Sequence, residues 1–292
     1  MDAPLSLISE LFDLPGSEQK KTISPAREKV GKDAAESEEL GKVCMADGDF
    51  EGAITHFQRA IDQGATSVPE ALLNLGAAYE AADMSPAAFR QYGKALRAQA
   101  SGELHVGLGS IYKRYGRLKD AISELEAAVK LEPANDYYAF KLAETLRDNG
   151  FRSDALAAIS HAVAAKPDDA FYHFWMGDLL LEMHKYAESA EAFHAALEFS
   201  PGDDYILMLT SLALWGQGKR PEAIRAIRLA GDLDSDKFIY AGVLEEFLRA
   251  EGLEEEARLE EKRASKMDDY DRDLIDRLLR KSDIHLSSDT KG

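Results

Sequence analysis

The sequence predicts an all-α superhelix of about seven stacked helical hairpins, closed by a C-terminal capping helix. Two observations predict it. Small residues recur about every 34 positions over most of the chain, and a second column of small residues lies seven positions earlier. A period of this length indicates repeated units that bury their apolar faces only by stacking on neighbours.

Alanine dominates both columns. The two columns are Ala60, Ala95, Ala128, Ala162, Ala196, Ala230 and Ala264, and Ala53, Ala88, Ala121, Ala155, Ser189, Ala223 and Ala257. A large apolar residue stands between them in most units, as at Phe57, Tyr92 and Phe193. Small residues let two helices approach closely, and large residues fill the space between them. These columns therefore mark the second helix of each hairpin.

The first helix of each unit carries an apolar residue followed by a small one. The clearest pairs are Leu40-Gly41, Leu75-Gly76, Leu108-Gly109, Leu142-Ala143 and Met176-Gly177. Glycines such as Gly48 and Gly116 follow at the expected turn, and Pro133, Pro167 and Pro201 close three units. Glycine turns the chain and proline stops a helix, so each unit is a helix, a turn and a second helix.

These motifs resemble the tetratricopeptide repeat family, whose pattern is W-x2-L-G-x2-Y, then A-x3-F, A and P. The stretches "LLNLGAAYEAADMSPAAFRQYGKA" and "HVGLGSIYKRYGRLKDAISELEAA" match it best. The resemblance covers residues 34–267 and implies a right-handed superhelix. The family's first position, usually Trp, departs from the pattern, and the sixth and seventh units carry Thr210-Ser211 and Leu244-Glu245 in place of Leu-Gly.

Four further segments flank or close the repeats. Residues 1–16 are expected to form a short amphipathic helical segment, and residues 17–33 are polar and predict a flexible linker. Residues 268–284 predict the capping helix, because "DRDLIDRLLR" gathers its apolar residues on one face. The last residues, 285–292, are expected to be a disordered tail.

The resemblance places the first helix of each unit on the concave side, where members of the family usually bind partners. In units four to six the corresponding positions are rich in aromatic residues. The predicted partner-binding groove comprises Tyr137, Phe140, Lys141, Phe171, Phe174, Trp175, Asp178, Tyr205, Met208 and Trp215. Two interpretations stay open. The aromatics form an exposed apolar groove for an amphipathic helix or extended peptide, or they pack between layers as ordinary core.

The segment 5–14 places its apolar residues on one half of a helical wheel, with Ser6, Ser9, Glu10 and Asp13 on the other. The docking residues are Leu5, Ile8, Leu11 and Phe12. So short a helix needs a partner surface. Three partner surfaces stay open for it: its own repeats, another copy of the chain to give a homo-oligomer, and a separate protein or membrane surface.

Composition narrows the class of function. The formal net charge of −18 disfavours nucleic acid and anionic membranes as partners. The single cysteine, Cys44, allows no intramolecular disulfide, and no apolar run is long enough to span a membrane. With no cationic lead-in at the N-terminus, the expected location is the cytoplasm.

The sequence carries no phosphate-binding loop, no metal-ligand motif and no catalytic constellation, so we expect no enzyme activity, no cofactor and no metal. The predicted function is a non-catalytic scaffold or adaptor that binds a peptide or helix of a partner protein. Two alternatives remain open: an assembly factor that shields an apolar segment of a client, and a regulatory subunit of an enzyme.

Overall fold

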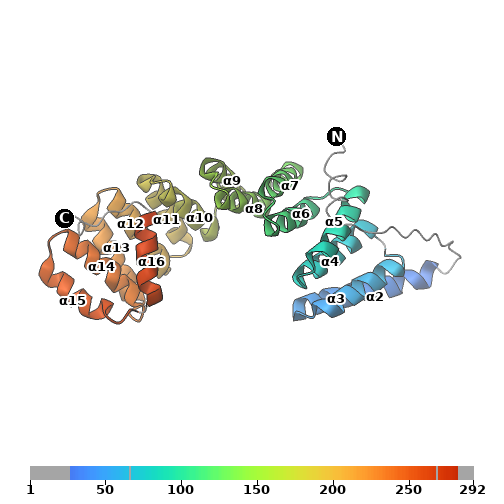
Figure 1. Ribbon diagram of the computed structural model, residues 1–292, viewed down its shortest axis with the longest axis horizontal. Helices are drawn as coiled ribbons and strands as arrows, with labels where there is room; N and C mark the ends of the chain where they lie inside the picture. The colour runs from blue at the N-terminus through green and yellow to red at the C-terminus, as the bar shows by residue number, and fades with distance from the viewer. Residues whose placement is uncertain (1–26, 66, 268, 282–292) are drawn as a thin grey trace. The chain divides into compact units, whose positions relative to one another are not determined.

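The computed structural model describes residues 27–65, 67–267 and 269–281. Within these ranges every regular element is an α-helix. Fourteen of the helices pair into seven consecutive hairpins, and a last helix follows them (Figure 1). The predicted all-α class and its hairpin repeat are therefore confirmed.

The chain divides into two compact units, Met1–Glu132 and Pro133–Gly292. The helices of the first unit are α2 (Arg27–Asp47), α3 (Phe50–Asp62), α4 (Val68–Ala81), α5 (Ser85–Ala98), α6 (Gly102–Arg114) and α7 (Leu118–Leu131). Those of the second are α8 (Asp136–Asp148), α9 (Arg152–Ala165), α10 (Ala170–Glu182), α11 (Tyr186–Phe199), α12 (Asp204–Gly216), α13 (Arg220–Leu233), α14 (Phe238–Ala250), α15 (Glu254–Ala264) and α16 (Asp269–Lys281).

The N-terminal boundary of the repeats differs from the expected one. Helix α2 begins at Arg27, so the last residues of the segment predicted as a linker, 27–33, are helical. Arg, Glu and Lys are good helix formers, and their intrinsic propensity favours this extension of the helix. The predicted amphipathic segment 1–16 and the predicted tail 285–292 lie outside the described residues.

The turn inside each hairpin requires one residue with a left-handed backbone. Five of the seven turns use glycine, at Gly48, Gly116, Gly150, Gly218 and Gly252. The other two use Asp83 (φ 60°) and His184 (φ 58°). Aspartate tolerates this conformation better than most residues, so the turn is preserved where the glycine column is broken.

A large side chain of the second helix fills the gap opposite a small residue of the first. Tyr92 of α5 is the clearest case, because its ring lies between the backbones of Gly76 in α4 and Gly107 in α6. A Cβ at position 76 would lie 2.4 Å from Tyr92 Cε1, and one at position 107 would lie 2.6 Å from Cε2. Gly177 faces Phe193 in the same way, at 2.7 Å. These contacts set how closely the helices pack.

The last helix closes the second unit. Apolar residues of α16, Ile275 and Leu278, are buried in the same core cluster as residues of α12 and α14. A Cβ at Gly242 of α14 would lie 2.8 Å from Ile275 Cδ1, so α16 lies against that face of α14. By the 34-residue spacing, position 242 corresponds to Phe140, Phe174 and Met208. Helix α16 therefore covers a first-helix face of the repeat.

Gly76→Ala and Gly93→Ala are a matched pair within one hairpin. Because buried Tyr92 leaves no room for a methyl group at position 76, we expect Gly76→Ala to lower the free energy of unfolding by about 1–3 kcal/mol. A Cβ at position 93 meets nothing within 4 Å, so Gly93→Ala should raise it by up to about 1 kcal/mol. Urea denaturation measures both. Equal effects of the two substitutions would contradict this packing.

Candidate interaction surface

Three exposed aromatic side chains repeat at an interval of 34 residues on successive first helices. They are Tyr137, Phe171 and Tyr205, with 49%, 47% and 36% of their surface exposed. Each lies two residues after a helix cap whose side chain accepts a backbone N–H bond; the caps are Asn135, Asp169 and Asp203. The helix starts therefore fix these three side chains in equivalent positions on α8, α10 and α12.

Partly buried rings contact two of the three exposed ones. Phe140 of α8 contacts Phe171 and Trp175 of α10, with ring centroids 5.0 and 5.3 Å apart and edge-to-face geometry. Phe174 of α10 lies 6.2 Å from Tyr205 of α12. We call these six residues the aromatic surface: Tyr137, Phe140, Phe171, Phe174, Trp175 and Tyr205. Ring pairs in this geometry hold each other in place.

A charged cluster anchors one side of the aromatic surface. The guanidinium of Arg147, from α8, lies 4.6 Å from the ring centre of Trp175. It also donates hydrogen bonds to Asp178 and Glu182 of α10, with a Nε–Oε1 distance of 2.9 Å to Glu182. These contacts join α8 to α10 and fix the indole.

Burial and hydrogen-bond partners shift the pKa values of Arg147 and Tyr172. Burial alone would lower the pKa of Arg147, but the hydrogen bonds and charges of Glu182 and Asp178 outweigh it and raise that pKa. Burial and the hydrogen bond to Asp136 both raise the pKa of Tyr172. The Tyr172 hydroxyl donates to Asp136 at 2.5 Å, which is a second tie between α8 and α10.

The structure brings eight of the ten predicted groove residues together on this face. The six rings form the aromatic surface, and Asp178 pairs with Arg147. Lys141 lies 6.0 Å from the Phe140 ring centre, and its ammonium contacts Glu144 at 2.7 Å. All eight residues are at least partly exposed on α8, α10 and α12.

The placement of Met208 and Trp215 on the groove wall was wrong. Met208 is 0% exposed and Trp215 is 6% exposed, and both belong to the core of the second unit. Trp215 stacks on Phe247 of α14, with ring centroids 4.0 Å apart. Helices α14 and α16 contribute to the cluster that buries this part of α12. The predicted core interpretation therefore holds for these two residues.

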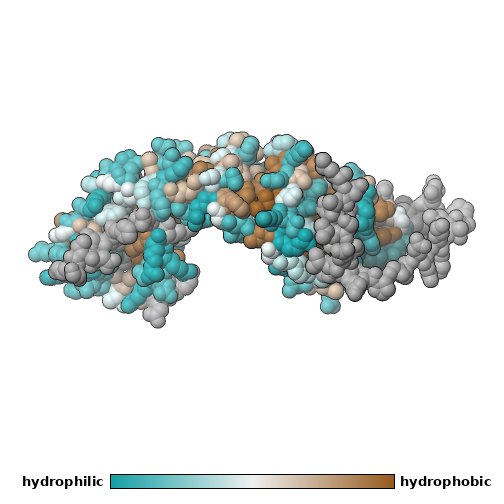
Figure 2. All heavy atoms as spheres, turned by 45° about the horizontal axis from the view of Figure 1, so that its top comes forward, coloured by the Kyte–Doolittle hydropathy of each residue, from teal (hydrophilic) through white to brown (hydrophobic). Residues whose placement is uncertain are grey.

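The three helices that carry the aromatic surface have an excess of acidic residues. On α8, α10 and α12 six Asp and Glu residues accompany only two Lys and Arg residues; they are Asp136, Glu144, Asp148, Asp178, Glu182 and Asp204, with Lys141 and Arg147. Such an excess disfavours anionic ligands and favours cationic ones. Figure 2 shows apolar side chains reaching a surface that is otherwise largely hydrophilic.

Sequence reasoning missed Arg147 and Glu182. The available signal was sequence separation. Arg147 contacts Asp178, 31 residues later, and Glu182, 35 residues later, on the next first helix. The same separation of 31 joins Arg114 to Asp83 and Arg220 to Glu251. Charge pairs at these intervals would have identified the contact.

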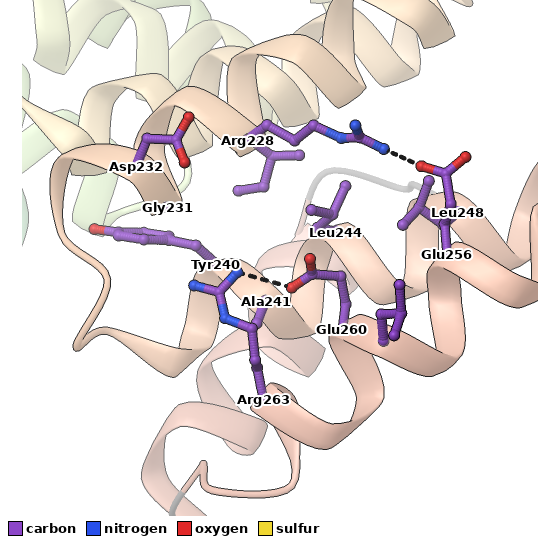
Figure 3. Close-up of a pocket in the computed structure, with 12 residues that line it drawn as sticks. Arg228, Gly231, Asp232, Tyr240, Ala241, Leu244, Leu248, Glu256, Glu260 and Arg263 are labelled. Atoms are coloured by element: carbon purple, nitrogen blue, oxygen red, sulfur yellow. Dashed lines mark hydrogen bonds and ion pairs between the residues drawn. The ribbon is translucent and has the colours of Figure 1, made fainter.

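A cavity of about 400 Å³ lies between α13, α14 and α15, on the side of the second helices (Figure 3). Apolar side chains such as Ile227 and Leu244 line it. Two ion pairs, Arg228 with Glu256 and Arg263 with Glu260, border it. Asp232 also lines the cavity, outside these two pairs.

The described parts of the chain contain no group of three or more His, Cys, Asp or Glu residues placed to hold a metal ion. None of the helices in the described ranges is both long and apolar enough to cross a membrane.

Comparison with known proteins assigns the family. The tetratricopeptide repeat model matches residues 38–103, 106–170, 140–204 and 176–237. These ranges cover more than half of the chain, so the protein belongs to the tetratricopeptide repeat family. The predicted resemblance is thus confirmed, and the fold is in general that of a protein-interaction scaffold. None of the curated proteins matches this sequence.

Solved structures show the same fold at low sequence identity. The C-terminal part of a repeat protein from Cytophaga hutchinsonii is 14% identical, covers 82% of this chain and 98% of its own, and gives a TM-score of 0.69. YrrB, described as a TPR protein with an unusual peptide-binding site, is 20% identical with coverages of 64% and 96% and a TM-score of 0.56. MamA from Desulfovibrio magneticus RS-1 is 18% identical with coverages of 56% and 93% and a TM-score of 0.53. Identities this low establish the fold alone.

Arg147→Ala tests the anchor of the aromatic surface. Removing the guanidinium takes the main cation from two carboxylates, one of which, Glu182, is 8% exposed. We expect the free energy of unfolding to fall by about 2–3 kcal/mol, below the value for a fully buried pair because Arg152 lies 3.5 Å from Glu182. The control is Arg225→Ala, whose pair with Glu222 lies at the surface and should contribute less than about 1 kcal/mol. Equal losses in urea denaturation would contradict the anchoring role.

Proposed function

We propose that the protein is a non-catalytic scaffold that binds an amphipathic helix of a partner protein on the aromatic surface of its second unit. The observation that carries the proposal is the row of half-exposed rings on three successive first helices, at Tyr137, Phe171 and Tyr205. Exposed apolar surface is costly in water, and contiguous patches of it normally mark sites of interaction.

The rings suit a hot spot of binding. Tyr and Trp offer a large contact area at a small cost in conformational entropy, and Tyr, Trp and Arg are the residues most enriched among binding hot spots. Here Trp175 is already oriented by Arg147 and Phe140, so little ordering is required when a partner arrives.

The protein's own last helix supports a helical occupant. Helix α16 covers a first-helix face of α14 with Ile275 and Leu278, three residues apart. Phe140 of α8 and Phe174 of α10, both in the aromatic surface, occupy the position that corresponds to Gly242 by the 34-residue spacing. An amphipathic helix with apolar residues at such spacing would cover it in the same manner.

The charge of this face selects the chemistry of the partner. Because acidic residues outnumber basic ones on the three helices, the partner helix carries Lys or Arg beside its apolar side. Attraction of this kind raises the association rate and weakens with added salt.

A library of helical peptides displayed on phage, selected on the intact protein, tests the proposal. We expect selected sequences to combine apolar residues three and four positions apart with Lys or Arg. Phe171→Ala and Tyr205→Ala should each weaken binding of the best peptide by about tenfold or more, as truncation of a hot-spot residue does. Fluorescence anisotropy of the labelled peptide measures the dissociation constant.

The matched control is Phe151→Ala. Phe151 is also 49% exposed, but it precedes α9, beyond the end of α8 opposite to Tyr137. This substitution should leave the affinity unchanged. Selection of acidic peptides, or equal losses for Phe151→Ala and Phe171→Ala, would reject the aromatic surface as the binding site.

A further inference from the structure

The first hairpin exposes two apolar residues of α2 whose equivalents in the next two hairpins are buried. Val43 of α2 is 54% exposed. Residues at the same position of the later first helices are at most 1% exposed; they are Ala78, Ile111, Thr145, Leu179, Ala213 and Phe247. Leu40 is 43% exposed, whereas its equivalents Leu75 and Leu108 are buried. We call Leu40 and Val43 the open edge.

In the second and third hairpins, the residues equivalent to Leu40 and Val43 are packed by the second helix of the preceding hairpin. Leu75 and Ala78 pack in one cluster with three residues of α3, Ile54, Phe57 and Ile61. In the next hairpin, Leu108 and Ile111 share a cluster with Phe89, Tyr92 and Leu96 of α5. Both second helices thus present apolar residues at i, i+3 and i+7. A helix that covers the open edge in the same way would carry apolar residues at this spacing.

The chain carries such a segment just upstream. Leu5, Ile8 and Phe12 have the same i, i+3, i+7 spacing, and the polar residues of the segment fall on the opposite side of the helical wheel. We infer that residues 5–14 form a helix that docks on the open edge of the same chain, in the position of a preceding second helix.

The connecting residues allow this arrangement. An antiparallel helix beside Leu40 and Val43 would end near residue 37, about 15 Å along α2 from Arg27. A flexible connection of twelve residues, the length of 15–26, has a typical end-to-end distance of about 20 Å, which is enough to span this separation.

The open edge is smaller than an internal interface, which suits a short occupant. Its third position holds exposed Glu36, where the later units have buried apolar residues such as Leu104 and Ile206. A full hairpin would bury Glu36, whereas a helix of ten residues over Leu40 and Val43 leaves it in water. The charge at Glu36 therefore selects a short helix over another repeat.

Cross-linking of the full chain tests the location. In a Cys44→Ala background, Ile8→Cys is combined with Val43→Cys, with Tyr205→Cys on the aromatic surface, or with exposed Leu259→Cys on α15 as the control. We expect rapid disulfide formation within one chain only for the Val43→Cys pair. A faster cross-link to position 205 or 259, or a cross-linked dimer as the main product at position 43, would overturn the inference.

A double-mutant cycle tests whether the contact stabilises the first hairpin. We expect Ile8→Ser and Val43→Ser each to speed hydrogen exchange of the α2 amides about tenfold, and the double variant to exchange no faster than either. Ser9→Ala, on the polar side of the segment, should change nothing. Unchanged exchange in Ile8→Ser, or additive effects in the double variant, would contradict docking. Val43 is 54% exposed, so Val43→Ser leaves the buried core of the hairpin intact.

Discussion

The close approach of two helices at a small residue, with a large side chain from the neighbouring helix filling the gap, is the contact on which the structure depends. Tyr92 lies between Gly76 and Gly107, and Phe193 faces Gly177 in the same manner. Because each ring contacts a first helix, and Tyr92 contacts two, these pairs fix both the hairpin and its stacking on the next one. The face of a first helix that does not take part in these contacts is available to bind a partner.

The sequence predicted the repeat well because spacing alone encodes this contact. The columns around Ala60 and Ala95 place the second helices, and the hairpins follow directly from the period. Even the two broken turns, at Asp83 and His184, keep the required left-handed backbone. Periodicity failed at the start of α2, since no apolar pattern distinguishes the polar residues 27–33 from a linker.

The candidate surface was harder to predict, because equivalent positions in the repeat have different neighbours. Phe174 and Met208 occupy the same position one period apart, yet only Phe174 reaches the surface. The difference comes from contacts far along the chain, where α14 and α16 contribute to the core around α12. The Arg147 cluster depends on contacts between helices that no single unit displays. The position of a residue within one repeat therefore identifies a candidate binding face but does not predict how far that face extends along the chain.

The physical account makes the first helices the binding elements and the second helices their support. Hydrogen exchange of the intact protein, with and without a selected basic amphipathic peptide, tests this division most directly. The account predicts slower exchange in α8, α10 and α12, and little change in α9, α11 and α13. Protection concentrated on the second helices, or around the cavity between α13 and α15, would contradict it.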